Sequence, residues 1–208
     1  MSDKEKSSWP VQGYQVLGKA ASIQKRKTSG LERKSENTIS DIWEMQKAII
    51  LLIYSRHAFR TEPASWRLKE TESDNSLVRP RGSRRFVVTN RRHKTEKSMG
   101  TLKITLDLNV SKALAKFLPK RNKVITKHDY FLINRSGNKL PPGGLSKLIL
   151  RLTKQNLNIP GLGVRLFRVL KATSNAELIQ KAADLQKEMG HSAEMQKTYV
   201  RKKQKTAK

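Results

Sequence analysis

The sequence lacks cysteine, so neither a disulfide nor a cysteine-based zinc site can form among its 208 residues. The only histidines are too scattered along the chain to indicate a metal cluster: His57, His93, His128 and His191. We therefore expect a protein that works without a metal ion or another cofactor.

Acidic residues are also scarce. The chain has 17 Asp and Glu against 44 Lys and Arg, a formal net charge of +27. A small soluble domain usually carries a single-digit net charge. The excess therefore predicts a polyanionic partner.

Long hydrophobic runs are missing as well. No apolar stretch approaches the roughly 20 residues that span a bilayer, and no signal pattern stands at the N-terminus. An anionic membrane surface would also attract this charge, but nucleic acid is the better prediction.

Composition along the chain predicts one domain flanked by two basic segments. Residues 1–38 combine Ser, Lys, Gln, Glu and Gly without a sustained period, which is typical of a disordered arm. Residues 39–203 contain the periodic segments of one domain, and residues 204–208 form a basic tail. The 36% of apolar residues is enough for one modest core.

The first predicted helix starts near Ile42, with Ser40 or Asp41 as its N-cap. Residues 65–70 are a possible short strand, and the polar residues 71–83 form a loop. Residues 85–90 and 101–108 are β-branched and predict a hairpin with the basic tip RRHKTEKSMG. Helices are expected over residues 110–118, 144–156, 162–172 and 175–189, and again from residue 192. The fold class is therefore α+β, mainly helical with a small antiparallel sheet.

Two stretches near the C-terminus carry residues that suit phosphate chemistry. In VRLFRVLKAT, Arg165 and Arg168 lie three residues apart on one face of a helix. In EMGHSAEMQKTYV, Gly190 ends one helix and Ser192 caps the next, while Tyr199 follows His191 by eight residues. Each stretch alone also fits a solvated helix face or a helix cap.

Taken together, the two stretches resemble the tyrosine recombinase (phage integrase) family. That family has His-x-x-Arg, then Thr, then Leu-Gly-His, then a nucleophilic Tyr. Here RLFRVLKAT, EMGHS and KTY follow in that order, with 23 residues from Arg168 to His191. The eight-residue step to Tyr199 is most similar to crypton-type and viral mobile-element recombinases.

The resemblance implies a catalytic-domain fold of this family and a set of site residues. The family's lysine at a hairpin tip corresponds to Lys94, with Lys97 as the second candidate. Its first arginine corresponds to Arg60, followed by Glu62, although Arg56 and Arg67 compete for that role. DNA-contacting residues would include Arg91, Arg92, Lys97, Lys171 and Lys197.

The implied reaction is cleavage and rejoining of DNA through a 3′-phosphotyrosyl intermediate. Tyr199 would attack the phosphate, the arginines would stabilise its charge, and Lys94 would protonate the leaving oxygen. The implied partner is double-stranded DNA, with self-association into a tetramer on it and no membrane. The implied location is with DNA, in a host nucleus or cytoplasm, and not secreted.

The sequence departs from the family at several places, among them the position of Glu62, two residues after Arg60 where the family more often has three. Arg165 stands where the family most often has histidine, and only residues 1–38 stand where relatives have an N-terminal helical domain. Two other functions therefore stay open. One is relaxation of DNA by a type IB topoisomerase, and the other is a basic nucleic-acid-binding protein without catalysis.

Overall fold

The computed structural model describes residue 10 and residues 13–188. The described part is mainly helical and contains a small antiparallel sheet of three strands, as the α+β prediction requires. The chain divides into two compact units, residues 1–170 and residues 171–208. This division differs from the single domain predicted over residues 39–203.

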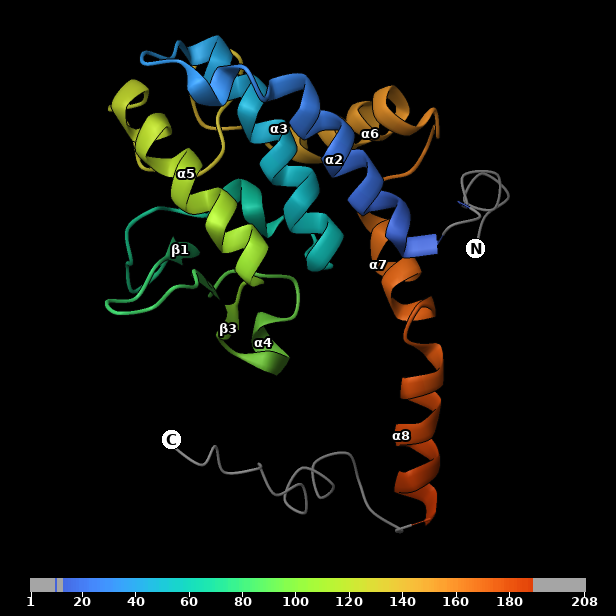
Figure 1. The fold of residues 1–208 in the computed structure, drawn as a ribbon. Coiled ribbons are helices and arrows are strands. Elements are labelled where there is room, and N and C mark those ends of the chain that lie inside the picture. The colour runs from blue at the N-terminus through green and yellow to red at the C-terminus, as the bar shows by residue number, and fades with distance from the viewer. Residues whose placement is uncertain (1–9, 11–12, 189–208) are drawn as a thin grey trace, which may run out of the picture. The chain divides into compact units, whose positions relative to one another are not determined.

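Helix α2 (Val16–Thr28) corrects the prediction that residues 1–38 form a disordered arm. It follows a short 3₁₀ turn, η1 (Gly13–Gln15), and packs against α3 (Ile39–Arg56), beside which it lies in Figure 1. Leu17, Ala20, Ala21 and Gln24 recur on one buried side of α2. The many Lys residues of this stretch hide a narrow apolar stripe, and burial of that stripe against α3 offsets the entropy of ordering.

A reciprocal capping box starts α3, and its N-cap is Thr38, not Ser40 or Asp41. The Thr38 hydroxyl accepts a hydrogen bond from the Asp41 backbone N–H at 3.2 Å. In return, the Thr38 N–H donates to the Asp41 carboxylate at 2.9 Å, and Lys34 pairs with the same carboxylate at 2.9 Å. A short 3₁₀ turn, η2 (Leu31–Arg33), precedes this cap.

The sheet has the order β1-β2-β3 and consists of β1 (Ser76–Val78), β2 (Val87–Asn90) and β3 (Leu102–Thr105). Strand β1 lies in the stretch predicted as loop, because Leu77 is buried and pairs with Val88. Residues 65–70 form no strand, and Arg67 makes only isolated bridges there. The predicted hairpin is confirmed with shorter strands, and its tip carries the single-turn helix α4 (Glu96–Met99).

Four helices follow the sheet in the described chain: α5 (Leu108–Val124), α6 (Gly144–Leu157), α7 (Val164–Thr173) and α8 (Ala176–Glu188). The last three agree with the predicted helices to within two residues. Helix α5 continues past the predicted end because Pro119 removes only one donor, while Phe117 and Arg121 stay buried on its inner side. The helix predicted from Ser192 lies outside the described residues, and no described helix has the length and apolarity to cross a membrane.

A buried aromatic cluster joins the helices to the sheet. Trp66 is completely buried, with Phe59 edge-on at 5.1 Å and Phe131 stacked at 5.9 Å between ring centroids. The short 3₁₀ turn η3 (Glu62–Ser65) leads into Trp66. This cluster holds the segment after α3 against the strands, where the candidate site lies.

Replacing Asp41 with Ala is expected to lower the free energy of unfolding by about 1 kcal/mol at neutral pH. Hydrogen bonds from the Thr38 backbone and from Lys34 hold the pKa of Asp41 below its usual range. The carboxylate therefore stabilises the fold above a pH of about 4, and the contribution disappears as pH falls through the lowered pKa. Denaturant unfolding at several pH values measures this loss.

Ser40→Ala is the matched control, because the exposed Ser40 would be the cap if the sequence-based alternative held. We expect its stability to equal that of the wild type within a few tenths of a kcal/mol. A larger loss in Ser40→Ala than in Asp41→Ala would contradict the capping box.

Candidate functional site

Four of the predicted catalytic residues lie in the unit formed by residues 1–170. Arg60 follows α3, and Lys94 lies in the β2–β3 connection, while Arg165 and Arg168 are on α7. Lys171 belongs to the second unit. The predicted residues His191, Lys197 and Tyr199 lie outside the described residues.

Tyr54 connects the Arg60 segment with α7. Its side chain is fully buried, its hydroxyl donates to the Arg60 carbonyl, and its ring lies 5.6 Å from that of Phe167. Burial, with a smaller effect of Glu62, raises the Tyr54 pKa well above its ordinary value, so the hydroxyl stays protonated and remains a donor. Phe167 immediately precedes Arg168. Arg60 and Arg168 therefore lie on segments that meet at Tyr54.

Trp66 connects the same segment with the sheet. Its indole N–H donates to the Asn90 side chain at 2.8 Å, at the end of β2. On the other side, the Asp107 backbone N–H donates to His57 Nε2 at 3.0 Å. Residues 57–66 are thus held at two points against the strands that carry the hairpin.

Asn75 fixes the base of the hairpin. It is 3% exposed, and its side-chain oxygen accepts from the backbone N–H groups of Arg91 at 2.7 Å and Arg92 at 2.8 Å. Its amide nitrogen donates to the Ser65 hydroxyl at 2.8 Å and to the Arg92 carbonyl at 2.9 Å. The hairpin therefore leaves the sheet from a defined position beside η3.

The side chains on these segments differ in whether they already have partners. Arg60 and Arg168 are half-buried, and in the described part of the chain neither guanidinium has a hydrogen bond or ion pair. Lys94 and Lys97 are exposed at the hairpin tip. A half-buried guanidinium without a carboxylate is available to an anionic ligand.

The basic residues at the hairpin base already have acidic partners. Arg91 approaches Glu70 at 3.5 Å, and Arg92 approaches Asp74 at 3.7 Å. Both pairs are partly exposed, so they are weak and can exchange for phosphate contacts.

Arg67, a competitor for the role of Arg60, is a structural residue. Its guanidinium pairs with Asp129 at 2.7 Å and with Asp74 at 3.2 Å, and it lies over the Tyr130 ring. Hydrogen bonds that the guanidinium donates to these two carboxylates raise the pKa of Arg67. Arg56 is exposed at the end of α3, and it remains a competitor.

Glu62 is the acidic residue nearest Arg60 in sequence. One of its carboxylate oxygens is buried and has no hydrogen-bond partner in the described part of the chain. Unsatisfied buried groups are rare in native proteins, and Trp43, Arg121 and Asp129 each have one as well. Among residue 10 and residues 13–188, no group of three or more His, Asp or Glu side chains is placed to hold a metal ion.

Comparison of the chain with protein-family models, curated proteins and solved structures gives no significant match. The candidate site rests on the residues and contacts of this chain. Sequence reasoning missed Tyr54, Trp66 and Asn75, because an isolated Tyr, Trp or Asn carries no spacing signal before the chain folds.

Replacing Asn75 with Ala is expected to lower the free energy of unfolding by about 2–3 kcal/mol, since it leaves two backbone N–H groups without their acceptor. Chemical denaturation measures the loss. Faster hydrogen exchange at the Arg91 and Arg92 amides would locate it at the hairpin base.

Asn109→Ala is the control, because the Asn109 side chain is exposed on the first turn of α5. We expect it to change stability by less than about 0.5 kcal/mol. Unchanged exchange at the Arg91 and Arg92 amides in Asn75→Ala would show that Asn75 does not hold the hairpin.

Proposed function

We propose that this protein cleaves and rejoins DNA through a phosphotyrosine intermediate, as in the tyrosine recombinases that its sequence resembles. One observation carries the proposal. Arg60, Lys94 and Arg168 are more than 100 residues apart from first to last, yet their segments are joined through Tyr54, Trp66 and Asn75. Segments that carry unpaired cations and are joined in this way suit a site for a phosphodiester.

In the proposed reaction the Tyr199 oxygen attacks the scissile phosphorus. A bond forms between phosphorus and the tyrosine oxygen, and the bond from phosphorus to the 5′ oxygen breaks. Lys94 gives its proton to that 5′ oxygen, and His191 takes the tyrosine proton or donates to a phosphate oxygen. Attack by the 5′ hydroxyl on the phosphotyrosine reverses each step and rejoins the strand.

Arg60 and Arg168 would stabilise the negative charge that builds on the non-bridging oxygens. A guanidinium suits this role because its planar donors bind two oxygens at once and it stays protonated. Arg165 is exposed on α7, three residues before Arg168, and would donate to the same phosphate in place of the family's histidine.

The direct test is a covalent adduct between the full chain and nicked duplex DNA. We expect the wild-type protein to form an adduct with a pool of nicked duplexes of varied sequence, and Tyr199→Phe to form none. Arg60→Ala and Arg168→Ala are expected to slow its formation by about 100-fold or more, since each removes a preorganised charge at the phosphate. Gel electrophoresis after denaturation separates the adduct.

Arg135→Ala is the matched control, because Arg135 is exposed on the connection between α5 and α6. Adduct formation that survives in Tyr199→Phe would exclude Tyr199 as the nucleophile. If the wild type and all variants bind the duplex and none of them forms an adduct, a DNA-binding protein without catalysis would be favoured. Relaxation of supercoiled DNA without exchange between two sites would favour the topoisomerase alternative.

The role of Lys94 is tested with a substrate whose 5′ leaving oxygen is replaced by sulfur. A thiolate leaves without protonation, so the general acid is no longer needed. We expect Lys94→Ala to slow cleavage of the oxygen substrate by about 10²- to 10⁴-fold and to cleave the sulfur substrate at nearly the wild-type rate. Rates of adduct formation on the two substrates give the comparison.

Lys97→Ala distinguishes the two candidates at the hairpin tip. With Lys94 as the acid, the rate ratio of Lys97→Ala on the two substrates matches that of the wild type. Rescue by sulfur in Lys97→Ala and not in Lys94→Ala would assign the role to Lys97.

A further inference from the structure

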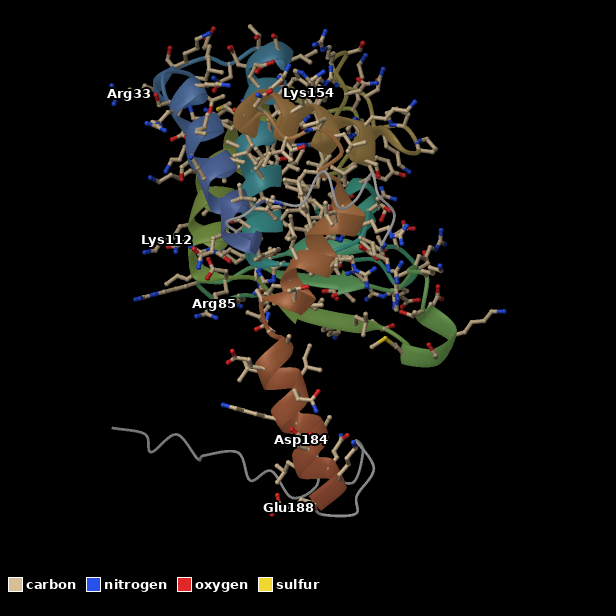
Figure 2. All side chains as sticks on the ribbon, turned by 90° about the vertical axis from the view of Figure 1, so that its right-hand side faces the viewer. Arg33, Arg85, Lys112, Lys154, Asp184 and Glu188 are labelled. Carbon is tan, nitrogen blue, oxygen red and sulfur yellow. The ribbon has the colours of Figure 1, made fainter. Side chains whose placement is uncertain are left out.

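A second basic surface lies at the β1–β2 connection, away from the hairpin tip. Residues 79–85 read RPRGSRR, and their four arginines are exposed. Together with the first turns of α5 they line a groove whose walls include Arg79, Arg81, Arg84, Ser111 and Lys112. Figure 2 shows Arg85 and Lys112 at the same edge of the fold, while Arg33 lies at its other end. We call residues 79–85 with Lys112 and Lys116 the loop surface.

The loop surface has no acidic neighbour in sequence. No Asp or Glu occurs between Asp74 and Glu96, or between Asp107 and Asp129. In the described structure Arg81, Arg84, Lys112 and Lys116 have no ion pair, whereas Arg91 and Arg92 at the hairpin base do. Uncompensated positive charge of this density is the electrostatic footprint of a phosphate-binding surface.

Hydrogen bonds close the loop that carries these arginines into a turn. Its turn closes through a hydrogen bond from the Ser83 N–H to the Pro80 carbonyl at 3.0 Å, with Gly82 at φ +75° as a type II turn requires. The Ser83 hydroxyl accepts from the Arg85 N–H at 3.0 Å. An ordered turn presents its guanidinium groups with little further loss of entropy on binding.

The loop is also fastened to α5. The Phe86 N–H donates to the Ser111 hydroxyl at 3.1 Å, and Ser111 is 1% exposed. The Arg79 guanidinium lies 5.9 Å from the centre of the Phe86 ring. These contacts hold the arginines of the loop next to Lys112, which lies one helical turn before Lys116.

We infer that the loop surface binds the phosphate backbone of double-stranded DNA beside the proposed cleavage site. Single-stranded DNA is bound largely by stacking of bases on exposed aromatic rings. Residues 79–85 include no aromatic residue, and Phe86, which follows them, is buried. Charge without a stacking ring fits the regular phosphates of a duplex, which supply affinity without sequence preference.

The inference rests on the proposed function in the choice of DNA as the polyanion and in the position of the cleavage site. The loop surface and the hairpin tip lie at opposite ends of β2, a strand of four residues, or about 13 Å. A single duplex can therefore contact the loop surface and the hairpin tip together only if it continues for about four base pairs past the reacting phosphate. The loop surface extends the DNA contact beyond the residues that act on the phosphate.

The test compares two double variants in the Tyr199→Phe background, in which the proposed chemistry is removed. Arg81→Gln with Arg84→Gln alters the loop surface. Arg26→Gln with Arg33→Gln removes the same charge from exposed positions on α2 and η2. Kd for a duplex is measured against salt concentration, and thermal unfolding checks that both variants fold.

For the Arg81 and Arg84 variant we expect the slope of log Kd against log salt to fall by about 1.8, with at least a tenfold rise in Kd at low salt. The slope of the Arg26 and Arg33 variant is expected to match the parent. Equal slopes in the two double variants would overturn the loop surface. The choice of duplex DNA would be overturned if the Arg81 and Arg84 variant lost as much affinity for single-stranded DNA as for the duplex. It would also be overturned if the parent bound duplex RNA as tightly as duplex DNA.

The two proposals fail separately. If the wild-type protein forms no adduct but the salt slope falls as expected, the loop surface stands and the proposed catalysis does not. If the adduct forms and the salt slopes are equal, catalysis stands without the loop surface.

Discussion

Pairing a buried hydroxyl or indole N–H with an acceptor stabilises a fold, because leaving it unpaired costs about 1–3 kcal/mol. In this protein Tyr54 and Trp66 are paired in this way. The Tyr54 hydroxyl reaches the Arg60 carbonyl, and the Trp66 indole reaches Asn90 at the end of β2. Since both rings are completely buried, the segment between α3 and the sheet is held on two sides, and Phe167 adds α7 to the same cluster.

The positive charge of the chain has two kinds of environment. Arg67 and Arg121 are structural, since Arg67 pairs with two carboxylates and Arg121 donates to the carbonyls of Ile125, His128 and Tyr130. Burial lowers the pKa of Arg121 to about 10, and it still carries its proton at neutral pH. Arg60, Arg168 and the arginines of the loop surface have no such partners among the described residues. Two carboxylates thus hold Arg67 and backbone carbonyls hold Arg121, while Arg60, Arg168 and the loop surface have no acidic partner among the described residues.

Much of the helical fold could be predicted from periodicity. Helices α6, α7 and α8 match their predicted ranges because their apolar residues recur at helical spacing. Helix α2 was missed because its buried residues include small Ala and a Gln, which carry little hydrophobic signal beside many Lys. Strand β1 was missed because three residues between polar turns have no readable period, and only pairing with β2 makes them a strand.

The candidate site could likewise be predicted only in part. The types and spacing of Arg165, Arg168, His191 and Tyr199 can be read along the chain, and so can the Lys-rich hairpin tip. The choice between Arg60 and Arg67 cannot, because it depends on Asp129, which lies 62 residues from Arg67 in sequence and meets it only in the folded protein. Capping by Thr38 instead of Ser40 is likewise a matter of backbone geometry.

By itself the sequence determined the net charge, the helical periodicity and the residue types available for phosphate chemistry, since these follow from composition and order. The tertiary structure decided which of the described arginines are paired with carboxylates, and which segments meet at Tyr54 and Trp66. It also decided that residues 79–85 face the start of α5. The physical reason is that burial and ion pairing depend on distances in space between residues far apart in the chain, and those distances exist only after folding.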